Sequence, residues 1–330
     1  MKNEKQKWNL YEKRSQFRNF YFHKVIRRHI FEKWINKDPY IPFYANRWVM
    51  GLNTTNRRIA DKIRSGEPFM VARFGNTELC VMTSVLKRRL FGSTAETEAR
   101  FEEWFGNLQT GAGFFPGEPE LAERFTDLML ASSKQIDIIA MFHCYLDDYV
   151  ISQYMPGCKV TFLNHIEPWR CREPWTMALE GKKVLVIHPF EESIIEQYQK
   201  RKQLFPGTKV LPAFELKTLK AVQTIAGERD ERFETWFDAL EYMYKEAMKI
   251  DFDVAIIGCG AYGLPLAAKL KAAGKQAIHM GGATQILFGI KGRRWVDNPR
   301  AGIIFNDAWT YPKESETPKN CKVVENHCYW

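Results

Sequence analysis

Short apolar runs alternate with amphipathic stretches along most of the chain. Six runs rich in Val, Ile, Ala and Met predict strands buried on both faces, over residues 69–74, 136–142, 160–163, 184–187, 254–257 and 276–280. Helical periodicity is found over residues 76–90, 95–108, 119–132, 192–204, 234–249 and 264–273, and another helix is expected to begin at Thr54 or Thr55 and to end at Gly66. This alternation predicts an α/β fold: a Rossmann-like, open, mainly parallel sheet with helices on both faces.

Residues 1–35 have a different character, because ten Lys or Arg face three Glu there and supply +7 of the net charge of +9. The remainder is nearly neutral, so nucleic acid is not a predicted partner. Phe22, Ile26, Ile30 and Trp34 are spaced as one stripe of a helix. A basic amphipathic helix of this kind lies on an anionic membrane surface, or it packs on the main domain or on a dimer partner; the pattern leaves these open. We divide the chain into this N-terminal helical segment, residues 1–45, and an α/β domain, residues 46–330.

The composition excludes several classes of protein. With 45% hydrophobic residues the chain can bury a full core, so global disorder is excluded. The longest uncharged apolar stretch, residues 254–268, is too short and too rich in glycine to span a bilayer, and no secretory leader opens the chain. Seven singly scattered cysteines favour neither a disulfide framework nor a zinc site. A cytosolic protein in a reducing compartment is expected.

The strongest local motif is a glycine-rich loop between a predicted strand and a predicted helix. Gly258, Gly260 and Gly263 form Gly-x-Gly-x-x-Gly, which lets a backbone approach a phosphate at the start of a helix. An NAD(P)-dependent oxidoreductase is one interpretation, but the next strand brings no Asp or Glu for a ribose and the motif stands late in the chain. Another interpretation is a tight strand-to-helix connection that binds no ligand. Gly281 and Gly282 follow the next strand and offer further backbone amides.

A second junction between strand and helix carries charged side chains. Arg73 follows a predicted strand, Gly75 permits a sharp turn, and Glu78 lies in the first turn of the next helix. Arg73 is suited to a phosphate, and Glu78 to a divalent cation or a sugar hydroxyl. Glu78 is also explained as an acid that stabilises the start of a helix.

Two further groups follow predicted strands. His188 and Glu191 are candidates for a base that activates an acceptor hydroxyl, or they are a loop histidine and the first acid of a helix. Lys291, Arg293 and Arg294 are suited to a diphosphate or an anionic lipid-linked acceptor, or they form a solvated basic loop.

Together these motifs resemble those of a known family. Arg-Phe-Gly-x-x-Glu-Leu at residues 73–79, the glycine-rich loop and Gly-Lys-Gln-Ala-Ile-His-Met-Gly-Gly at residues 274–282 are similar to motifs of bacterial glycosyltransferases of the GT-D fold. The resemblance covers residues 50–330 and includes residues 186–193 and the terminal Cys-Tyr-Trp. It implies a hexosyltransferase-like enzyme that uses a nucleotide-sugar, typically UDP-linked, with Mn²⁺ or Mg²⁺. The family's Asp-x-Glu motif is Asn76-Thr77-Glu78 here, so one negative charge is missing and weaker cation binding is expected.

The resemblance also implies roles for residues and a setting for the protein. Glu78, His188 and Glu191 are the predicted catalytic residues, and Glu78 is the predicted metal ligand. The nucleotide-sugar is expected to contact Arg73, Gly75, Asn76, Thr77, Gly258, Gly260, Tyr262, Gly263, Gly281 and Gly282. The expected acceptor is a glycan or a lipid-linked sugar of capsule, other surface polysaccharide or glycoprotein assembly, and the expected location is the cytoplasm or the inner face of the cell membrane. A non-catalytic scaffold of the same fold is the remaining alternative, because the Asp is absent.

Overall fold

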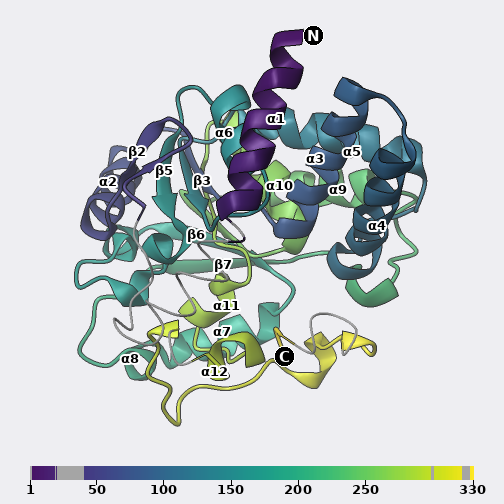
Figure 1. Ribbon diagram of the computed structural model, residues 1–330. Coiled ribbons are helices and arrows are strands. Elements are labelled where there is room, and N and C mark those ends of the chain that lie inside the picture. Colours follow the sequence, from purple (N-terminus) through teal and green to yellow (C-terminus); the bar gives the residue numbers. More distant parts are fainter. Residues whose placement is uncertain (1, 19, 21–40, 299–300, 322–327) are drawn as a thin grey trace.

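The computed structural model describes residues 2–18, 20, 41–298, 301–321 and 328–330. In this part of the chain a nine-stranded sheet has the order β1-β2-β5-β4-β3-β9-β8-β6-β7 (Figure 1). Neighbouring strands are parallel except in the β1–β2 hairpin at one edge. The strands are β1 (Phe43–Tyr44), β2 (Arg47–Met50), β3 (Phe69–Ala72), β4 (Ile138–Met141), β5 (Lys159–Phe162), β6 (Lys183–His188), β7 (Glu215–Lys220), β8 (Val254–Ile257) and β9 (Gln276–His279). The predicted mainly parallel α/β sheet is confirmed.

Successive residues of a strand point to opposite sides of the sheet, and here both sides are apolar. Helices therefore cover both faces. In β8, Ala255 and Ile257 join one apolar cluster, whereas Val254 and Ile256 join the other. The first cluster lies under α1 (Lys2–Phe17), α3 (Asn76–Phe91), α4 (Ala95–Ala112), α5 (Pro119–Ser133), α6 (Asp147–Tyr154), α9 (Trp236–Met248) and α10 (Gly263–Ala272). The second lies under α2 (Leu52–Ser65), α7 (Glu191–Gln199), α8 (Arg201–Leu204), α11 (Ala283–Leu287) and α12 (Arg293–Val296). None of the helices in the described ranges has the length and apolar character of a membrane span.

The structure differs from the predicted elements at a few places. Strand β7 was not expected, because its sequence Glu-Leu-Lys-Thr-Leu-Lys is that of an edge strand with half-exposed side chains. Helix α2 begins at Leu52, before the predicted cap, and Thr55 is buried instead, with its Oγ1 2.6 Å from Thr161 Oγ1. Its predicted end is confirmed, since Gly66 takes the left-handed conformation at φ 71°. The predicted helix over residues 192–204 is divided into α7 and α8.

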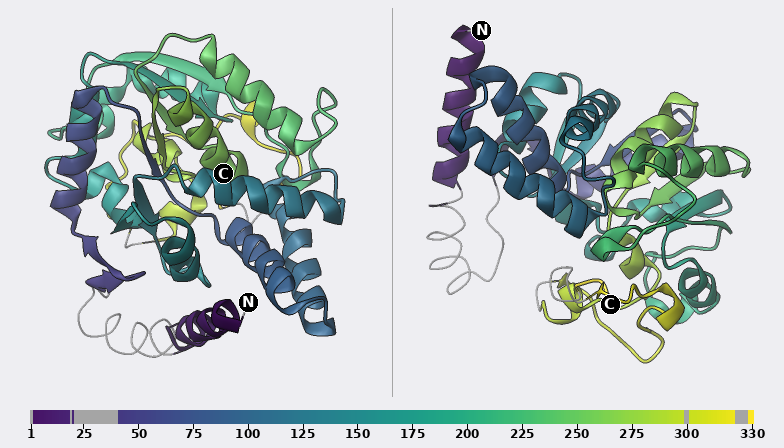
Figure 2. Two further views of the ribbon diagram at one scale, coloured as in Figure 1. Left: turned by 90° about the horizontal axis from the view of Figure 1, so that it is seen from above. Right: turned by 90° about the vertical axis from the view of Figure 1, so that its right-hand side faces the viewer.

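Helix α1 packs on the domain through one face. Trp8, Tyr11 and Ser15 are buried, and the Trp8 ring lies 4.8 Å from the ring of Tyr149 in α6. The helix lies beside α3 and α6, at the opposite end of the molecule from the C-terminus (Figures 1 and 2). Packing on the main domain, one of the three interpretations of this segment, therefore describes residues 2–17. The predicted stripe of Phe22, Ile26, Ile30 and Trp34 lies outside the described residues.

The C-terminal segment is held on α7 by a buried carboxylate. Glu316 accepts hydrogen bonds from the backbone N–H of Glu192 at 2.7 Å and of Ser193 at 3.3 Å, and from the Ser193 hydroxyl. Nearby, Lys313 pairs with Glu192 and Glu196 on the same helix. A side chain from a distant segment thus caps the start of α7, where backbone amides have no helical partner.

We expect the substitution Glu316→Gln to lower the free energy of unfolding by about 1–3 kcal/mol, because it removes charge-assisted hydrogen bonds from buried donors. Urea unfolding at neutral pH measures the change. The matched control is Glu314→Gln, two residues away and exposed, which should change stability by less than about 0.5 kcal/mol. Equal stability of the two variants would contradict the role of Glu316 as a helix cap.

Candidate functional site

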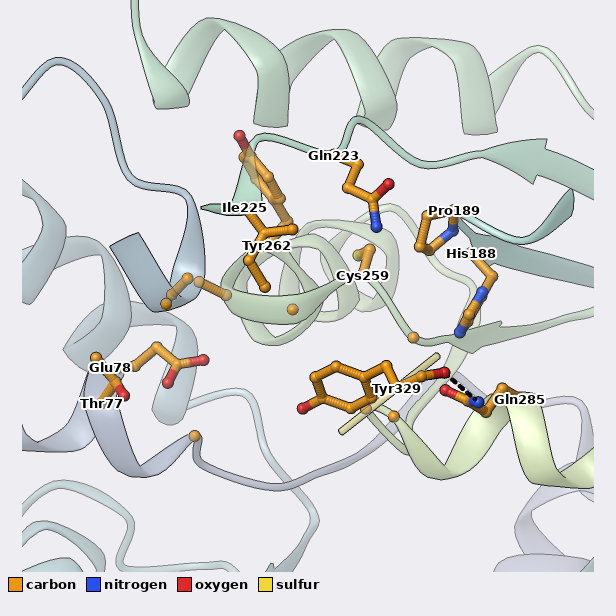
Figure 3. A pocket seen from close by; sticks show the side chains of 18 of the residues that line it. Thr77, Glu78, His188, Pro189, Gln223, Ile225, Cys259, Tyr262, Gln285 and Tyr329 are labelled. Atoms are coloured by element: carbon orange, nitrogen blue, oxygen red, sulfur yellow. Dashed lines mark hydrogen bonds between the residues drawn. The ribbon is translucent and has the colours of Figure 1, made fainter. Parts of the chain in front are cut away.

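A cavity of about 430 Å³ opens at the carboxyl ends of β3, β6, β8 and β9 (Figure 3). Strand β6 leads outward to β7, whereas β8 leads to β9 on its other side. The chain connections therefore diverge between β6 and β8. Open α/β sheets bind ligands at such a point, in the crevice beyond the carboxyl ends of the strands.

The turns after the central strands are hydrogen-bonded to one another. Gly258 donates its N–H to the Ile187 carbonyl at 2.9 Å, and Gly281 donates to the Ile257 carbonyl at 3.2 Å. A Cβ on Gly258 would lie 2.6 Å from the His188 ring and 2.7 Å from Thr284. Glycine is thus required at position 258 by the close approach of its neighbours, whether or not a ligand binds.

Arg73 contributes a positive charge to the cavity. Its guanidinium carbon lies 5.1 Å from the centre of the Phe142 ring, and its Nη1 lies against the turn at Gly281, which has φ +62°. The side chain is half-buried, and Nε has no hydrogen-bond partner. Within the described residues no carboxylate forms an ion pair with Arg73. A partly desolvated cation without a counter-ion is suited to an anionic ligand.

Glu78 follows Arg73 in the first turn of α3. Its carboxylate folds back over Gly75, since a Cβ on Gly75 would lie only 1.9 Å from Glu78 Oε2. Gly75 precedes the helix and provides no side-chain cap, and Asn76 and Thr77 at the start of α3 also line the cavity. Figure 3 shows Glu78 and His188 on opposite sides of the cavity, with the Tyr329 ring between them. They would contact different parts of a ligand.

His188 is a neutral, buried side chain. Burial lowers its pKa to about 3, and its Nδ1 accepts the N–H of Phe190 at 3.0 Å. The neutral tautomer with an accepting Nδ1 carries its proton on Nε2. His188 therefore offers a hydrogen-bond donor, and the nitrogen that a base would use is already occupied.

Aromatic side chains from distant segments complete the wall. The ring of Tyr262 stacks on that of Trp236 at 4.6 Å, and its hydroxyl lies 3.0 Å from Thr224 Oγ1. Tyr329 accepts a hydrogen bond on its carbonyl from Gln285 Nε2 at 3.0 Å, and its hydroxyl lies 3.2 Å from Arg294. Tyr329 covers Gly282, where a Cβ would lie 2.5 Å from its ring.

The structure places most of the predicted site residues around this one cavity. Its lining includes Arg73, Gly75, Asn76, Thr77, Glu78, His188, Gly258, Gly260, Tyr262, Gly281 and Gly282. Two others lie outside the lining: Glu191 is the first residue of α7, and Gly263 packs against the ring of His279. Sequence reasoning did not assign Gln223, Thr224, Gln285, Tyr329 and Trp330 to the site. The signal for the last two was the family resemblance, which includes the terminal Cys-Tyr-Trp.

The charged lining residues bear on the cofactor and on the basic loop. In the described ranges no three His, Cys, Asp or Glu side chains gather as a metal cluster, and Glu78 is the one acidic side chain of the described lining. The sequence suggested Lys291, Arg293 and Arg294 as cations for an anionic ligand. Of these, Arg294 lines the cavity, whereas Arg293 pairs with Asp297 at 3.0 Å. After β9 come Met280 and Gly281, so no acid is present there for the ribose of NAD.

Comparisons with known proteins concern the fold. A scan against protein-family models found no match, and a search of curated proteins found none either. Two solved structures are similar, described as "Selenomethionine substituted structure of domain of unknown function 1792 (DUF1792)" and "The highly conserved domain of unknown function 1792 has a distinct glycosyltransferase fold". Both are 12% identical over 82% of this chain, and 93% and 98% of those chains is covered, with TM-scores of 0.40 and 0.39. The second description names the kind of fold that the motifs resemble.

The lowered pKa values of two buried histidines indicate how the free energy of unfolding depends on pH. Burial lowers the pKa of His188 and of His279 to about 3, with Arg73 adding to the effect at His279, whereas the ordinary value is 6.5. Between pH 6.5 and 3 the unfolded chain binds protons that the folded chain does not. The free energy of unfolding should therefore fall with decreasing pH, by up to about 1.4 kcal/mol per pH unit for each histidine.

The variant His188→Asn tests this, because an Asn oxygen can still accept the Phe190 N–H. Urea unfolding at pH 7.0 and 5.5 should show a smaller loss of stability for the variant than for the unaltered protein. The same loss in both proteins would show that His188 is not the neutral buried group described above.

Proposed function

We propose that the protein is a glycosyltransferase that moves a sugar from a nucleotide-sugar, in the first instance UDP-linked, to an acceptor of surface-polysaccharide or glycoprotein assembly. One observation carries the proposal. The Arg73–Glu78 junction after β3 and the glycine-rich loop after β8, which are almost two hundred residues apart, line the same cavity.

The phosphate-binding part of the proposal rests on Arg73 and on backbone amides. The turns that begin α3, α10 and α11 all contribute to the lining. The start of the long helix α3 has amides without helical partners and a partial positive charge, both of which favour a diphosphate. Arg73 lies between two of these turns, against Gly281 and two residues before Gly75. A diphosphate held here would provide Arg73 with the counter-ion that the described residues do not supply.

Sugar transfer requires stabilisation of the leaving group. The acceptor oxygen forms a bond with the anomeric carbon, the bond from that carbon to the diphosphate oxygen breaks, and the nucleoside diphosphate leaves with the bonding electrons. The acceptor's proton passes to a base or to the leaving phosphate. Arg73 and the helix-start amides would stabilise the charge that develops on the diphosphate. His188 would donate a hydrogen bond through Nε2.

Glu78 is the carboxylate that we assign to the reacting end of the site. It would either hold a divalent cation or accept the acceptor's proton. One carboxylate, with diphosphate oxygens and water as the other ligands, is an arrangement that Mg²⁺ commonly takes. When bound, such a cation would neutralise diphosphate charge. His188 and Glu191 remain predicted catalytic residues, but we favour Glu78 because Nδ1 of His188 is occupied and Glu191 lies outside the lining.

Nucleotide binding and donor hydrolysis test the proposal. UDP at a hundred times its Kd should stabilise the protein by about 2.7 kcal/mol, visible as a higher Tm. Arg73→Gln should weaken UDP binding about ten- to a hundredfold, because a charge-assisted hydrogen bond is worth about 1.5–3 kcal/mol. The matched control is Arg58→Gln, an exposed arginine of α2, which should bind UDP normally.

A screen of nucleotide-sugars for slow hydrolysis detects transfer to water without a known acceptor. Glu78→Gln should abolish hydrolysis. If Glu78 holds a cation, the variant also loses the effect of Mg²⁺ or Mn²⁺ on UDP affinity; if it accepts the proton, UDP affinity is unchanged. Tight binding of NAD(P) in place of UDP would favour an oxidoreductase. UDP binding without hydrolysis of any donor, unaffected by Glu78→Gln, would favour a scaffold.

We also propose that the N-terminal side of the molecule contacts an anionic membrane surface, where a lipid-linked acceptor would be found. The hairpin of β1 and β2 presents Phe43 and Trp48, whose rings lie 5.6 Å apart, and Trp48 is 74% exposed. The outer face of α1 adds exposed Leu10 and Phe17 beside exposed lysines such as Lys7. Exposed aromatic rings together with cations favour the headgroup region of anionic lipids.

Flotation with vesicles that contain phosphatidylserine is expected to recover the protein, and pure phosphatidylcholine vesicles should recover much less. The double variant Phe43→Ser/Trp48→Ser should reduce recovery several-fold. The control is Ile304→Ser, because Ile304 is 89% exposed but lies in the C-terminal segment. Equal recovery of all three proteins would contradict the membrane contact, and concentration-dependent dimers lost in the double variant would assign the face to a second copy of the chain.

A further inference from the structure

We propose that Arg18, just after helix α1, is a positioning residue for the candidate nucleotide site. It fixes the loop between β4 and α6, residues 142–146, and this loop holds Phe142 against Arg73. The choice of ligand rests on the proposed function; the mechanical link does not.

The loop has a conformation that its surroundings must maintain. His143 and Leu146 both have left-handed backbones, with φ of 63° and 59°. This region is unfavourable for residues other than glycine, and such residues persist there only where neighbouring contacts hold them. The contacts on the loop therefore decide whether Phe142 stays in place.

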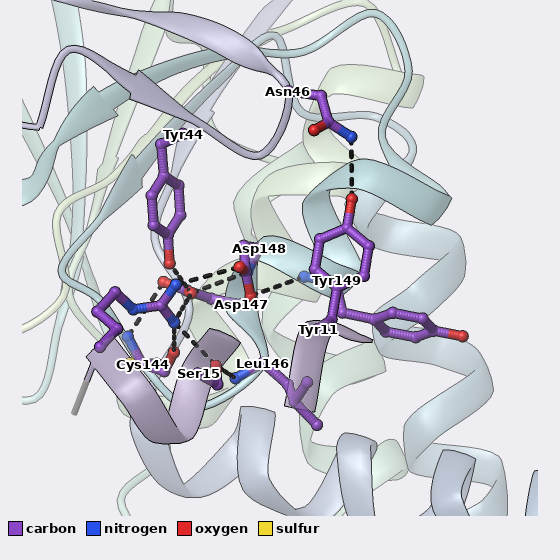
Figure 4. A network of polar contacts seen from close by, with 10 residues as sticks. Tyr11, Ser15, Tyr44, Asn46, Cys144, Leu146, Asp147, Asp148 and Tyr149 are labelled. Carbon is purple, nitrogen blue, oxygen red and sulfur yellow. Dashed lines mark hydrogen bonds and ion pairs between the residues drawn. The ribbon is translucent and has the colours of Figure 1, made fainter. Parts of the chain in front are cut away.

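Arg18 supplies several of these contacts (Figure 4). Its Nη2 donates to the Cys144 carbonyl at 3.1 Å and to Ser15 Oγ at 2.9 Å, and Ser15 Oγ in turn accepts the Leu146 N–H at 2.9 Å. The guanidinium also pairs with Asp147 at 3.3 Å and Asp148 at 3.1 Å. One cation from the N-terminal segment thus contacts the loop backbone and the first turn of α6.

The network is shielded from water, so its charges depend on one another. The side chains of Arg18 and Asp147 are 10% and 3% exposed. Burial raises the pKa of Asp147 to about 6, and Arg18 acts against that increase. Asp147 also accepts hydrogen bonds from the Tyr44 hydroxyl and, at 3.1 Å, from the Cys144 N–H. Removing Arg18 would leave two buried carboxylates without their cation, which disfavours the observed loop.

The loop connects this network to the cavity. Phe142 lines the cavity and lies under the Arg73 guanidinium, two residues before the Cys144 carbonyl that Arg18 binds. Arg73 has no carboxylate partner in the described residues, so the Phe142 ring and the Gly281 turn determine its place. A shift of the loop would move the cation that we assign to the diphosphate.

The test compares Arg18→Met with Lys13→Met, a control on the exposed side of α1. UDP affinity is measured by calorimetry, and amide hydrogen exchange reports on residues 70–79 and 142–148. Arg18→Met should weaken UDP binding about tenfold and increase exchange in both stretches, while residues 254–257 of β8 keep their protection. Lys13→Met should match the unaltered protein. Arg18→Lys, which keeps the charge but loses the forked geometry, should give an intermediate UDP affinity.

A double-mutant cycle tests the route. Phe142→Leu removes the ring under Arg73 without touching α1. If Arg18 acts through Phe142, the double variant Arg18→Met/Phe142→Leu should bind UDP only slightly more weakly than either single variant. Fully additive effects, or normal UDP affinity in a folded Arg18→Met protein, would overturn the proposal.

Two further outcomes are distinguishable. If the unaltered protein binds no UDP, the proposed function fails, and hydrogen exchange at residues 70–79 alone decides the link: no change in Arg18→Met overturns it. If Arg18→Met does not fold, Ser15→Ala replaces it, because that change removes the acceptor of the Leu146 N–H and keeps the ion pairs. Unchanged UDP affinity and unchanged exchange at residues 142–148 in Ser15→Ala then overturn the proposal.

Discussion

The site depends on the parallel order of four strands, β3, β9, β8 and β6. Their carboxyl ends lie along one edge, so the turns that follow them are neighbours even where the sequence separates them widely. The turns are also packed tightly: Gly258 donates to Ile187, and Gly281 donates to Ile257. A side chain larger than hydrogen does not fit at 258, where His188 and Thr284 occupy the space, and at 75 it would displace the Glu78 carboxylate. Close backbone packing thus creates the cavity and limits which residues can form it.

Much of this arrangement could be predicted from local sequence. Buried parallel strands are apolar throughout, and therefore all six central strands were found. Residues directly after such strands belong to one edge, which is why Arg73, Glu78 and the glycine-rich loop were expected to meet. Strand β7 was missed because an edge strand with exposed charges lacks the apolar pattern. The protonation state and tautomer of His188 were also not predictable, because they depend on the turn in which the Phe190 N–H donates to Nδ1.

The remaining walls could not be predicted because they come from long-range docking. Tyr329 lies in the cavity only because Gln285 binds its carbonyl and Gly282 leaves room for its ring. The segment that precedes it is anchored on α7 by Glu316, whose partners are 123 and 124 residues away in the sequence. No periodicity or spacing in the sequence signals a contact of that kind. The chain end is therefore part of the cavity for reasons that only the folded arrangement reveals.

Arg18, which binds the loop at residues 142–146, and Arg73, which lines the cavity, illustrate how partners distinguish structural from ligand-binding charge. Arg18 is surrounded by acceptors: two carboxylates, a carbonyl and a hydroxyl. Its two terminal nitrogens are paired within the protein, so its effect on a ligand must pass through the loop at residues 142–146. Arg73 contacts an aromatic ring and a glycine turn, and in the described residues no anion accompanies it. A desolvated cation in that state is stabilised when an anion binds, because the ligand then supplies the counter-charge. The Phe142 ring lies under Arg73, and Arg18 binds the carbonyl of Cys144 two residues later, so one loop connects the structural arginine to the arginine that lines the cavity.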